Sequence, residues 1–194
     1  MVLTPSIMQE LGMKAPDFTL PDSAGERYSL ADFSINKGLL IIFMCNHCPY
    51  VQHIRRKLVE KIREYQEQGV TVVAINSNDF AAYPDDNPQN MELDAQKHGY
   101  TFPYLVDERQ QVAKAYGAAC TPDFFLFDTK QKLVYRGQFD SARPGNSETV
   151  TGADLSSAIG QLVAEKPVPR EQRPSMGCNI KWKPGNEPDY FKPK

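Results

Sequence analysis

Apolar residues follow two different periods along the central part of the chain. Residues 38–44 (GLLIIFM) form a continuous apolar run, which is typical of a strand buried on both faces of a parallel or mixed sheet. After Pro49, apolar side chains recur every three or four residues as far as Tyr65, which predicts an amphipathic helix ending near Gly69. Residues 70–75 (VTVVAI) predict a second buried strand. This order of strand, helix and strand predicts a right-handed βαβ unit.

The flanking segments predict further elements of an α/β fold. In chain order we expect a hairpin with strands at 15–20 and 27–30 around a turn at 21–25, a polar loop at 76–90, a helix at 91–98, a strand at 103–106, a helix at 109–116, an antiparallel strand pair at 124–127 and 133–139, and a last helix capped by Thr151 that runs to about residue 164. Together they predict a central mixed β-sheet flanked by helices.

The last 30 residues differ in composition from the rest. Residues 165–194 contain six prolines, seven Lys or Arg, and the aromatic side chains of Trp182, Tyr190 and Phe191. Such a segment cannot form a domain alone, and a free tail would have little reason to carry aromatic groups. We therefore predict a domain at 1–164 and an irregular, proline-rich extension at 165–194 that packs on the body through these aromatics.

The overall composition excludes several classes of function. The chain has 194 residues, 41% hydrophobic and 24% charged, with a net charge of −2, which gives no basic surface for nucleic acid or an anionic membrane. The beginning of the chain lacks the pattern of a secretory signal, and the longest apolar stretch is far too short to cross a bilayer. We therefore expect a cytoplasmic protein.

Cys45 and Cys48 lie where the first buried strand is followed by the helix, in the sequence CNHC. Closely spaced cysteines in a reducing compartment are more often catalytic or metal-binding than structural. A dithiol that exchanges with a disulfide needs one thiolate and a second thiol nearby, and a helix N-terminus stabilises the thiolate. We predict Cys45 as the nucleophile and Cys48 as the resolving cysteine. Asn46 and His47 would tune the pair, with His47 stabilising the Cys45 thiolate and making the couple more oxidising.

Two other interpretations of the pair are a structural disulfide and half of a zinc site. Zinc requires four nitrogen or sulfur ligands, and C-x-x-C is a common half-site. The remaining candidate ligands, Cys120, Cys178, His53 and His98, occur singly. This disfavours zinc, and we expect no metal or organic cofactor.

Three segments also carry a resemblance to a known family. They are GMKAPDFTLPDSAGERYSLADF at 12–33, GLLIIFMCNHCPYV at 38–51, and ACTPDFFLFD at 119–128. Over about residues 12–164, the chain resembles the thioredoxin-fold superfamily in its peroxiredoxin-like branch, the alkyl hydroperoxide reductase and thiol-specific antioxidant group. The resemblance implies a thioredoxin-like fold. It also implies that Pro122 is a cis-proline facing the dithiol, and that Thr121 offers backbone groups to a bound thiol or peptide strand; the alternative is an ordinary proline at the start of a strand.

The chain departs from the peroxidase pattern Pro-x-x-x-Thr-x-x-Cys of this branch. When the Cys–Pro step is aligned, Cys48 takes the place of the peroxidatic cysteine, Cys45 that of the threonine, and Ile41 that of the proline. The loss of both residues favours dithiol exchange over peroxide reduction.

Cys120 and Cys178 are possible accessory thiols. Cys120 precedes Pro122 by two residues, so the fold would bring it near the dithiol; it is either a small buried side chain or a third redox thiol. Cys178 is either unpaired or a partner of Cys120 or of the active pair.

These observations predict a cytoplasmic thiol–disulfide oxidoreductase that exchanges electrons through Cys45 and Cys48. Its partners would be a disulfide-bearing protein or a small thiol substrate, and an upstream reductant. The alternatives are a thiol peroxidase and, as a protein without enzymatic activity, a zinc-bound or redox-sensing interaction module.

Overall fold

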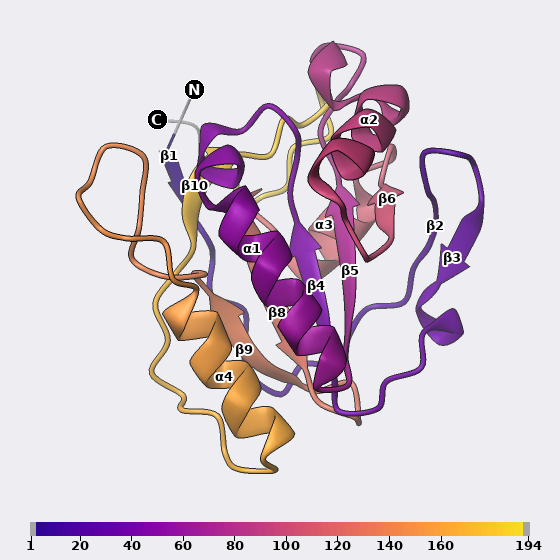
Figure 1. The fold of residues 1–194 in the computed structure, drawn as a ribbon. Coiled ribbons are helices and arrows are strands. Elements are labelled where there is room, and N and C mark those ends of the chain that lie inside the picture. Colours follow the sequence, from indigo (N-terminus) through magenta and orange to yellow (C-terminus); the bar gives the residue numbers. More distant parts are fainter. Residues whose placement is uncertain (1–2, 192–194) are drawn as a thin grey trace.

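A five-stranded mixed sheet forms the centre of the computed structural model, which describes residues 3–191 (Figure 1). Its strands, in spatial order, are β6 (Tyr104–Val106), β5 (Val70–Asn76), β4 (Gly38–Phe43), β8 (Asp123–Phe127) and β9 (Leu133–Gly137). β4, β5 and β6 are parallel, whereas β8 is antiparallel to both β4 and β9. The mixed sheet and the βαβ unit were both predicted from the sequence.

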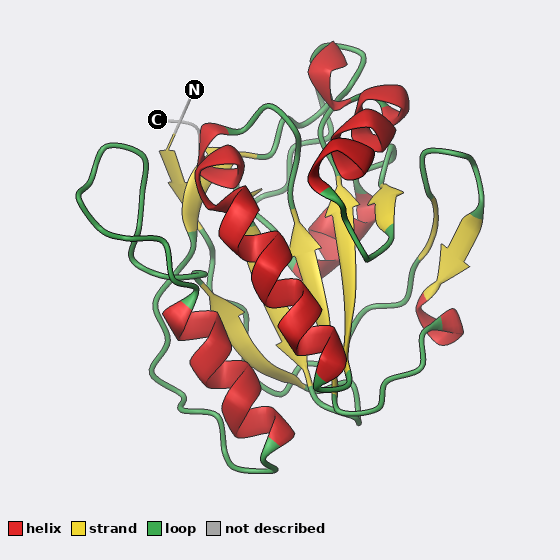
Figure 2. Ribbon diagram, in the orientation of Figure 1, coloured by secondary structure: helices red, strands yellow, loops and turns green. Residues whose placement is uncertain are grey.

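Helices cover both faces of this sheet (Figure 2). The core on one face is shared by α1 (Pro49–Glu67), α2 (Pro88–His98) and α4 (Ala153–Val163), and that on the other by α3 (Gln111–Tyr116). Successive side chains of a strand point to opposite faces. Leu40 and Ile42 therefore pack on the α1 side, while Leu39 and Ile41 pack on the α3 side. Burial on both sides explains why β4 is apolar throughout.

Two smaller sheets flank the main one. The hairpin is formed by β2 (Thr19–Pro21) and β3 (Arg27–Ser29), followed by the short 3-10 helix η1 (Leu30–Asp32). The other sheet has the order β1 (Leu3–Pro5), β10 (Met176–Asn179) and β7 (Cys120–Thr121), all antiparallel. Because β10 belongs to the C-terminal extension, the prediction of an irregular tail is wrong for these four residues, which gain strand structure from the two strands beside them.

Aromatic side chains and main-chain hydrogen bonds hold the extension against the body. Trp182 is buried and contacts the ring of Tyr190 edge-on at 6.4 Å, and the Tyr190 hydroxyl donates to the Ala118 carbonyl at 3.0 Å. The Lys181 amide donates to Asn78 Oδ1 at 2.8 Å. The extension therefore contacts the segment after β5 as well as β7. The ends of the predicted domains, at 1–2 and 192–194, lie outside the described residues.

Several predicted element boundaries differ from the structure. The predicted polar loop contains the 3-10 helix η2 (Pro84–Asp86). α2 starts three residues before its predicted first residue, because the Asn87 side chain caps it by accepting from the Asn90 main-chain amide at 2.8 Å. α3 starts at Gln111, and β9 ends at Gly137. The N-cap of α4 is Gly152, whereas Thr151 accepts the Ala153 N–H from outside the helix. Among residues 3–191, we find no helix that has both the length and the apolar character needed to span a bilayer.

Candidate active site at the CNHC segment

The two cysteines of CNHC lie between the end of β4 and the start of α1. Both are free and buried, with Cys45 1% and Cys48 0% exposed. Cys48 is the N-cap of α1, and Pro49 is its first residue. The predicted placement of Cys45 at the helix N-terminus is therefore wrong. The reason is Pro49, whose fixed φ and missing N–H suit the first helical position, so that the helix starts after the second cysteine.

Thr121 contacts both sulfur atoms. The Thr121–Pro122 peptide bond is cis, as the resemblance implied. Cys48 Sγ lies 3.1 Å from the Thr121 carbonyl oxygen, and Cys45 Sγ lies 3.6 Å from Thr121 Oγ1. The fold thus brings together four of the predicted site residues, although more than 70 positions separate the CNHC segment from Thr121 and Pro122.

The surroundings of the two thiols favour a thiolate at Cys48. Hydrogen bonds from Cys178 and Cys45, together with smaller contributions from Thr121 and the Val51 amide, lower the pKa of Cys48 against the opposing effect of burial. Burial raises the pKa of Cys45, and its contacts with Cys48 and the charge of Asp86 raise it further. In the reduced site the Cys48 thiol donates to the Thr121 carbonyl oxygen. The directions of the two pKa shifts favour Cys48, at the positive end of the helix dipole, as the thiol that ionises first, whereas we predicted Cys45 from the sequence.

Asp86, which the sequence analysis missed, organises the CNHC loop. Its carboxylate is fully buried and accepts from the Asn46 amide at 2.9 Å, from His47 Nδ1 at 2.6 Å and from Asn78 Nδ2 at 2.7 Å. Burial raises the pKa of Asp86, but the hydrogen bonds from His47 and Asn78 outweigh burial and hold it below the usual value. The hydrogen bond between His47 and Asp86 also raises the pKa of His47. Asp86 comes from a polar, proline-rich segment with no feature that would link it to CNHC.

His47 and Asn46 are both fixed in position. A ring nitrogen of His47 lies within 4.8 Å of Cys45 Sγ, but Nδ1 forms a hydrogen bond with Asp86 and the ring stacks on Tyr83 at 5.7 Å. When His47 is protonated, the Asp86 carboxylate balances its positive charge. The effect of His47 on the cysteines is therefore the effect of the His47–Asp86 pair. The Asn46 carbonyl accepts from Arg55 Nη2 at 2.8 Å.

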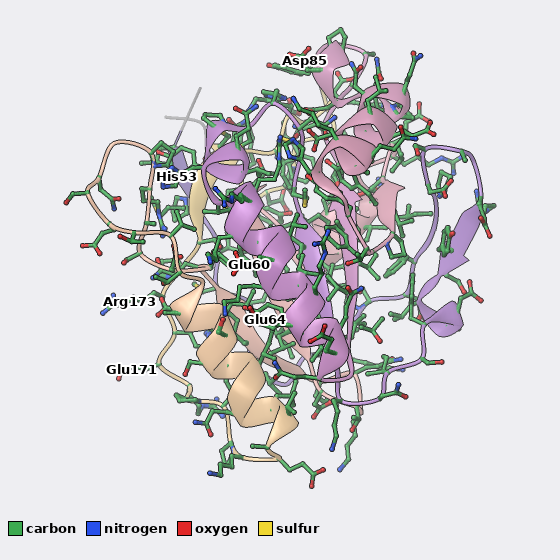
Figure 3. All side chains as sticks on the ribbon, viewed as in Figure 1. His53, Glu60, Glu64, Asp85, Glu171 and Arg173 are labelled. Atoms are coloured by element: carbon green, nitrogen blue, oxygen red, sulfur yellow. The ribbon has the colours of Figure 1, made fainter. Side chains whose placement is uncertain are left out.

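The contacts of Asn46 extend to neighbouring elements. Its carbonyl also accepts from Gln52, and its side-chain amide donates to the Asp85 carbonyl at 2.9 Å. Arg55, although charged, is buried and also pairs with Asp94 at 3.0 Å. Figure 3 labels Asp85 on η2 and His53 on α1. His53, one of the singly occurring candidate ligands, is exposed.

The described residues contain one group of three possible metal ligands: Cys45, His47 and Asp86, whose ligand atoms lie within 4.8 Å of one another. Asp86 already accepts hydrogen bonds from three residues, one of them His47. A metal ion would have to replace the proton between His47 and Asp86. The donor set therefore fits a hydrogen-bond network better than the four-ligand nitrogen and sulfur site that zinc prefers.

The two accessory cysteines differ in their contacts with the dithiol. Cys178 is the partner of Thr121 across β10 and β7, and it packs in the same buried cluster as Cys45 and Cys48. Cys120 is the next residue along β7, and its sulfur lies 3.7 Å from the Pro122 carbonyl oxygen. Both are buried. Cys178 is thus the accessory thiol that meets the active pair.

Comparison with known proteins identifies a family and relatives with names. The model of the AhpC/TSA family matches residues 11–136. The thiol-disulfide oxidoreductase ResA of Geobacillus thermodenitrificans is 33% identical over 123 residues, which cover 63% of this chain and 66% of ResA. The match therefore spans just under two thirds of this curated relative.

Solved structures match more of the chain. A hypothetical protein from Sinorhizobium meliloti is 50% identical with a TM-score of 0.92, and the match covers 94% of this chain and 100% of that one. The thioredoxin domain of a thiol-disulfide oxidoreductase from Bacteroides vulgatus is 18% identical with a TM-score of 0.59, over 78% of this chain and 99% of that one. The second match confirms the predicted thioredoxin-like fold. The first includes most of the C-terminal extension.

Proposed function

The chain belongs to the AhpC/TSA family, and from this premise we propose that it is a thiol–disulfide oxidoreductase with Cys45 and Cys48 as its redox pair. One observation carries the proposal. Two free thiols meet at Thr121, beside the cis-proline, and the surroundings of one of them stabilise its thiolate. These are the two requirements of dithiol exchange, a nucleophile and a resolving thiol.

The roles follow from where the anion lies. The Cys48 thiolate attacks one sulfur of the substrate disulfide, and the other substrate sulfur leaves as a thiolate. Cys45 then gives up its proton and attacks the Cys48 sulfur, which releases the first substrate sulfur. A Cys45–Cys48 disulfide remains, and two electrons have passed to the substrate. An upstream reductant must return them.

Thr121 and Pro122 form the surface on which we place the substrate. Pro122 lines a small pocket together with Tyr50 of α1 and Met176 of β10. Both sulfurs are buried, so a substrate disulfide reaches Cys48 after local opening of the segments around it. A disulfide-bearing protein or small thiol substrate, the upstream reductant and a cytoplasmic location are part of this proposal.

Insulin reduction with dithiothreitol tests the function. We expect catalysis by the wild-type protein and by Cys120→Ser, and no catalysis by Cys48→Ser. Cys45→Ser should retain the nucleophile but lack the resolving thiol, so it should accumulate a mixed disulfide at Cys48 and stop. Full activity of Cys48→Ser, or none in the wild type, would exclude this function.

A second candidate function is hydroperoxide reduction by Cys48. The placement of the thiolate on Cys48 favours it, because this cysteine aligns with the peroxidatic position of the family pattern. The thiolate would attack the O–O bond and become a sulfenic acid, and the Cys45 thiol would then displace water to form the disulfide. Single-turnover oxidation of the reduced protein by hydrogen peroxide tests it. A rate no greater than that of Cys48→Ser would exclude the peroxidase.

A further inference from the structure

We propose that Cys178 is a second disulfide partner of Cys48, so that the C-terminal extension takes part directly in the redox cycle. The inference rests on the proposed function, because that function supplies the Cys45–Cys48 disulfide from which the second disulfide forms. It adds a covalent redox role for the extension, which lies beyond the two cysteines of CNHC.

Strand register places Cys178 on the same side as the dithiol. Cys178 of β10 is paired with Thr121 of β7, and residues paired across antiparallel strands project to the same face. The Thr121 hydroxyl lies 3.6 Å from Cys45 Sγ, so this face is the one that carries the dithiol. Cys178 also belongs to the same buried core cluster as Cys45 and Cys48. The extension therefore brings a third buried cysteine to the face that carries the dithiol.

Cys120 provides an internal comparison. It precedes Thr121 on the same short strand, and side chains alternate between faces along a strand. Its sulfur is directed to the Pro122 carbonyl, 3.7 Å away. Cys120 and Cys178 are equally buried, at 0% and 1% exposure. The different contacts of these two thiols arise from the register and do not reflect a difference in burial.

Neighbouring strands on both sides fix the position of Cys178. β10 lies between β1 and β7, with Leu3 opposite Cys178 on the β1 side. A Cβ on Gly177 would lie 2.0 Å from the Thr121 carbonyl oxygen, so this close approach requires glycine. Burial shields Cys178 from thiols in solution. We take Cys48 as its exchange partner, because Cys178 is paired with Thr121 and the Thr121 carbonyl oxygen lies 3.1 Å from Cys48 Sγ.

The step is an internal thiol–disulfide exchange. Cys178 loses its proton, and its thiolate attacks the Cys48 sulfur of the Cys45–Cys48 disulfide. The Cys45–Cys48 bond breaks, the Cys48–Cys178 bond forms, and Cys45 leaves as a thiolate that takes up the proton. Two sulfurs are oxidised and one is reduced both before and after the step, so it needs no further oxidant.

The sequence allows a direct test by tryptic peptide mapping. Trypsin places Cys45 and Cys48 together in residues 38–55, Cys178 in 171–181, and Cys120 in 115–130. A Cys45–Cys48 bond stays within one peptide, whereas a Cys48–Cys178 bond joins two. The full-length protein is oxidised mildly with oxidised glutathione, free thiols are alkylated at low pH, and the monomer is isolated before digestion.

We expect the wild type to give both the internal disulfide and the peptide 38–55 joined to 171–181. Cys45→Ala, which leaves Cys48 with one partner, should give the joined peptide as its main product. Cys48→Ala and Cys178→Ala should lose it, and Cys120→Ala should form it like the wild type. An alkylated, unlinked Cys178 in oxidised Cys45→Ala would overturn the proposal, as would a joined peptide that persists in Cys48→Ala.

The experiment separates this inference from the proposed function. If the wild type reduces insulin and forms the internal disulfide but no variant gives the joined peptide, the proposed function stands and the role of Cys178 falls. If the wild type forms no Cys45–Cys48 disulfide and reduces no insulin, the proposed function itself fails.

Discussion

At the scale of single residues, Asp86 connects the CNHC loop with the rest of the molecule. Its buried carboxylate accepts from Asn46, His47 and Asn78, and Asn78 in turn accepts the Lys181 amide of the extension. A buried acceptor with several donors is costly to remove, because each donor then lacks a partner in a site without water.

Asp86→Asn should lower the free energy of unfolding by about 1–3 kcal/mol, because the new amide presents a donor to Asn78 and His47. The raised pKa of His47 adds stability at low pH that is lost as the pH rises through its folded value, whereas the lowered pKa of Asp86 adds stability that is lost as the pH falls through its own. The loss in unfolding free energy should therefore be largest above the pKa of Asp86 and below the pKa of His47, at about pH 5–6.

Urea unfolding at several pH values measures this effect. Asp85→Asn is the matched control, because the Asp85 side chain is exposed and its contact with Asn46 uses the main-chain carbonyl. Equal losses for both variants, or a loss for Asp86→Asn that grows steadily above neutral pH, would show that the His47–Asp86 pair is not the cause.

The thiolate of the reduced site should be found at Cys48. Ultraviolet absorbance of the thiolate should persist well below the usual thiol pKa of about 8.5 and disappear as the pH falls through the lowered pKa of Cys48. Cys48→Ser should abolish this signal, while Cys45→Ser should keep it because the serine hydroxyl can still donate to the sulfur. The opposite result for the two variants would restore Cys45 as the nucleophile.

Loss of His47 should make the Cys45–Cys48 couple more reducing. His47→Ala removes a positive charge that interacts favourably with the Cys48 anion and leaves the Asp86 carboxylate uncompensated, and both changes disfavour the thiolate form. We expect a potential more negative by roughly 20–40 mV, equivalent to about 1–2 kcal/mol. Equilibration with glutathione measures it, with exposed His53→Ala on the same helix as the control. An unchanged potential would mean that the His47–Asp86 pair has no influence on the dithiol.

At the scale of elements, the close pairing of β10 with β7 depends on Gly177. Gly177→Ala would place a methyl group 2.0 Å from the Thr121 carbonyl oxygen, so the strands must separate. We expect a loss of about 1–3 kcal/mol in stability and faster proteolysis of the extension. Gly160→Ala in α4 has open space around the new Cβ and should stabilise by about 0.5–1 kcal/mol. Wild-type protease resistance in Gly177→Ala would show that the extension does not depend on this contact.

Local pattern was sufficient to predict the elements that carry CNHC. The apolar run of β4 and the period of α1 lie next to the cysteines in sequence, and each has a pattern that belongs to one kind of element. β10 has no such pattern, since the residues MGCN become a strand through partners at Leu3 and Thr121. Asp86 was missed for the same reason, because its role depends on donors about 40 residues away.

The order of the cysteine roles could have been read more closely from the sequence. The predicted helical period follows Pro49, a residue that suits the first helical position, so Cys48 could already have been placed at the N-cap. We nevertheless predicted the first cysteine of the pair as the thiolate, from the general property of C-x-x-C at a helix start. The contribution that no sequence pattern contains is the position of Cys178, which the extension brings into the same buried cluster as Cys48 from 130 residues away.

At the scale of the whole molecule, the two disulfides that we propose for Cys48 close loops of very different length. The Cys45–Cys48 bond closes a loop of four residues, whereas the Cys48–Cys178 bond would enclose about 130 residues, from the start of α1 to β10. In the chain-entropy model, a cross-link stabilises the folded protein more when it closes a longer loop, because it restricts the unfolded chain more strongly. Which partner Cys48 holds should therefore change the stability of the entire fold.

Comparison of two oxidised variants measures that difference. Oxidised Cys45→Ala can form the long loop and oxidised Cys178→Ala the short one, and the model gives the former roughly 3 kcal/mol more stabilisation on oxidation. Each variant is compared with its own reduced form in urea, which removes the direct effect of the substitution. The change in unfolding free energy between reduced and oxidised Cys120→Ala is the reference, because this variant retains Cys45, Cys48 and Cys178. An equal gain on oxidation in Cys45→Ala and Cys178→Ala would mean that the extension is not tied to α1 by a covalent bond, because the long loop would then be absent from the unfolded chain.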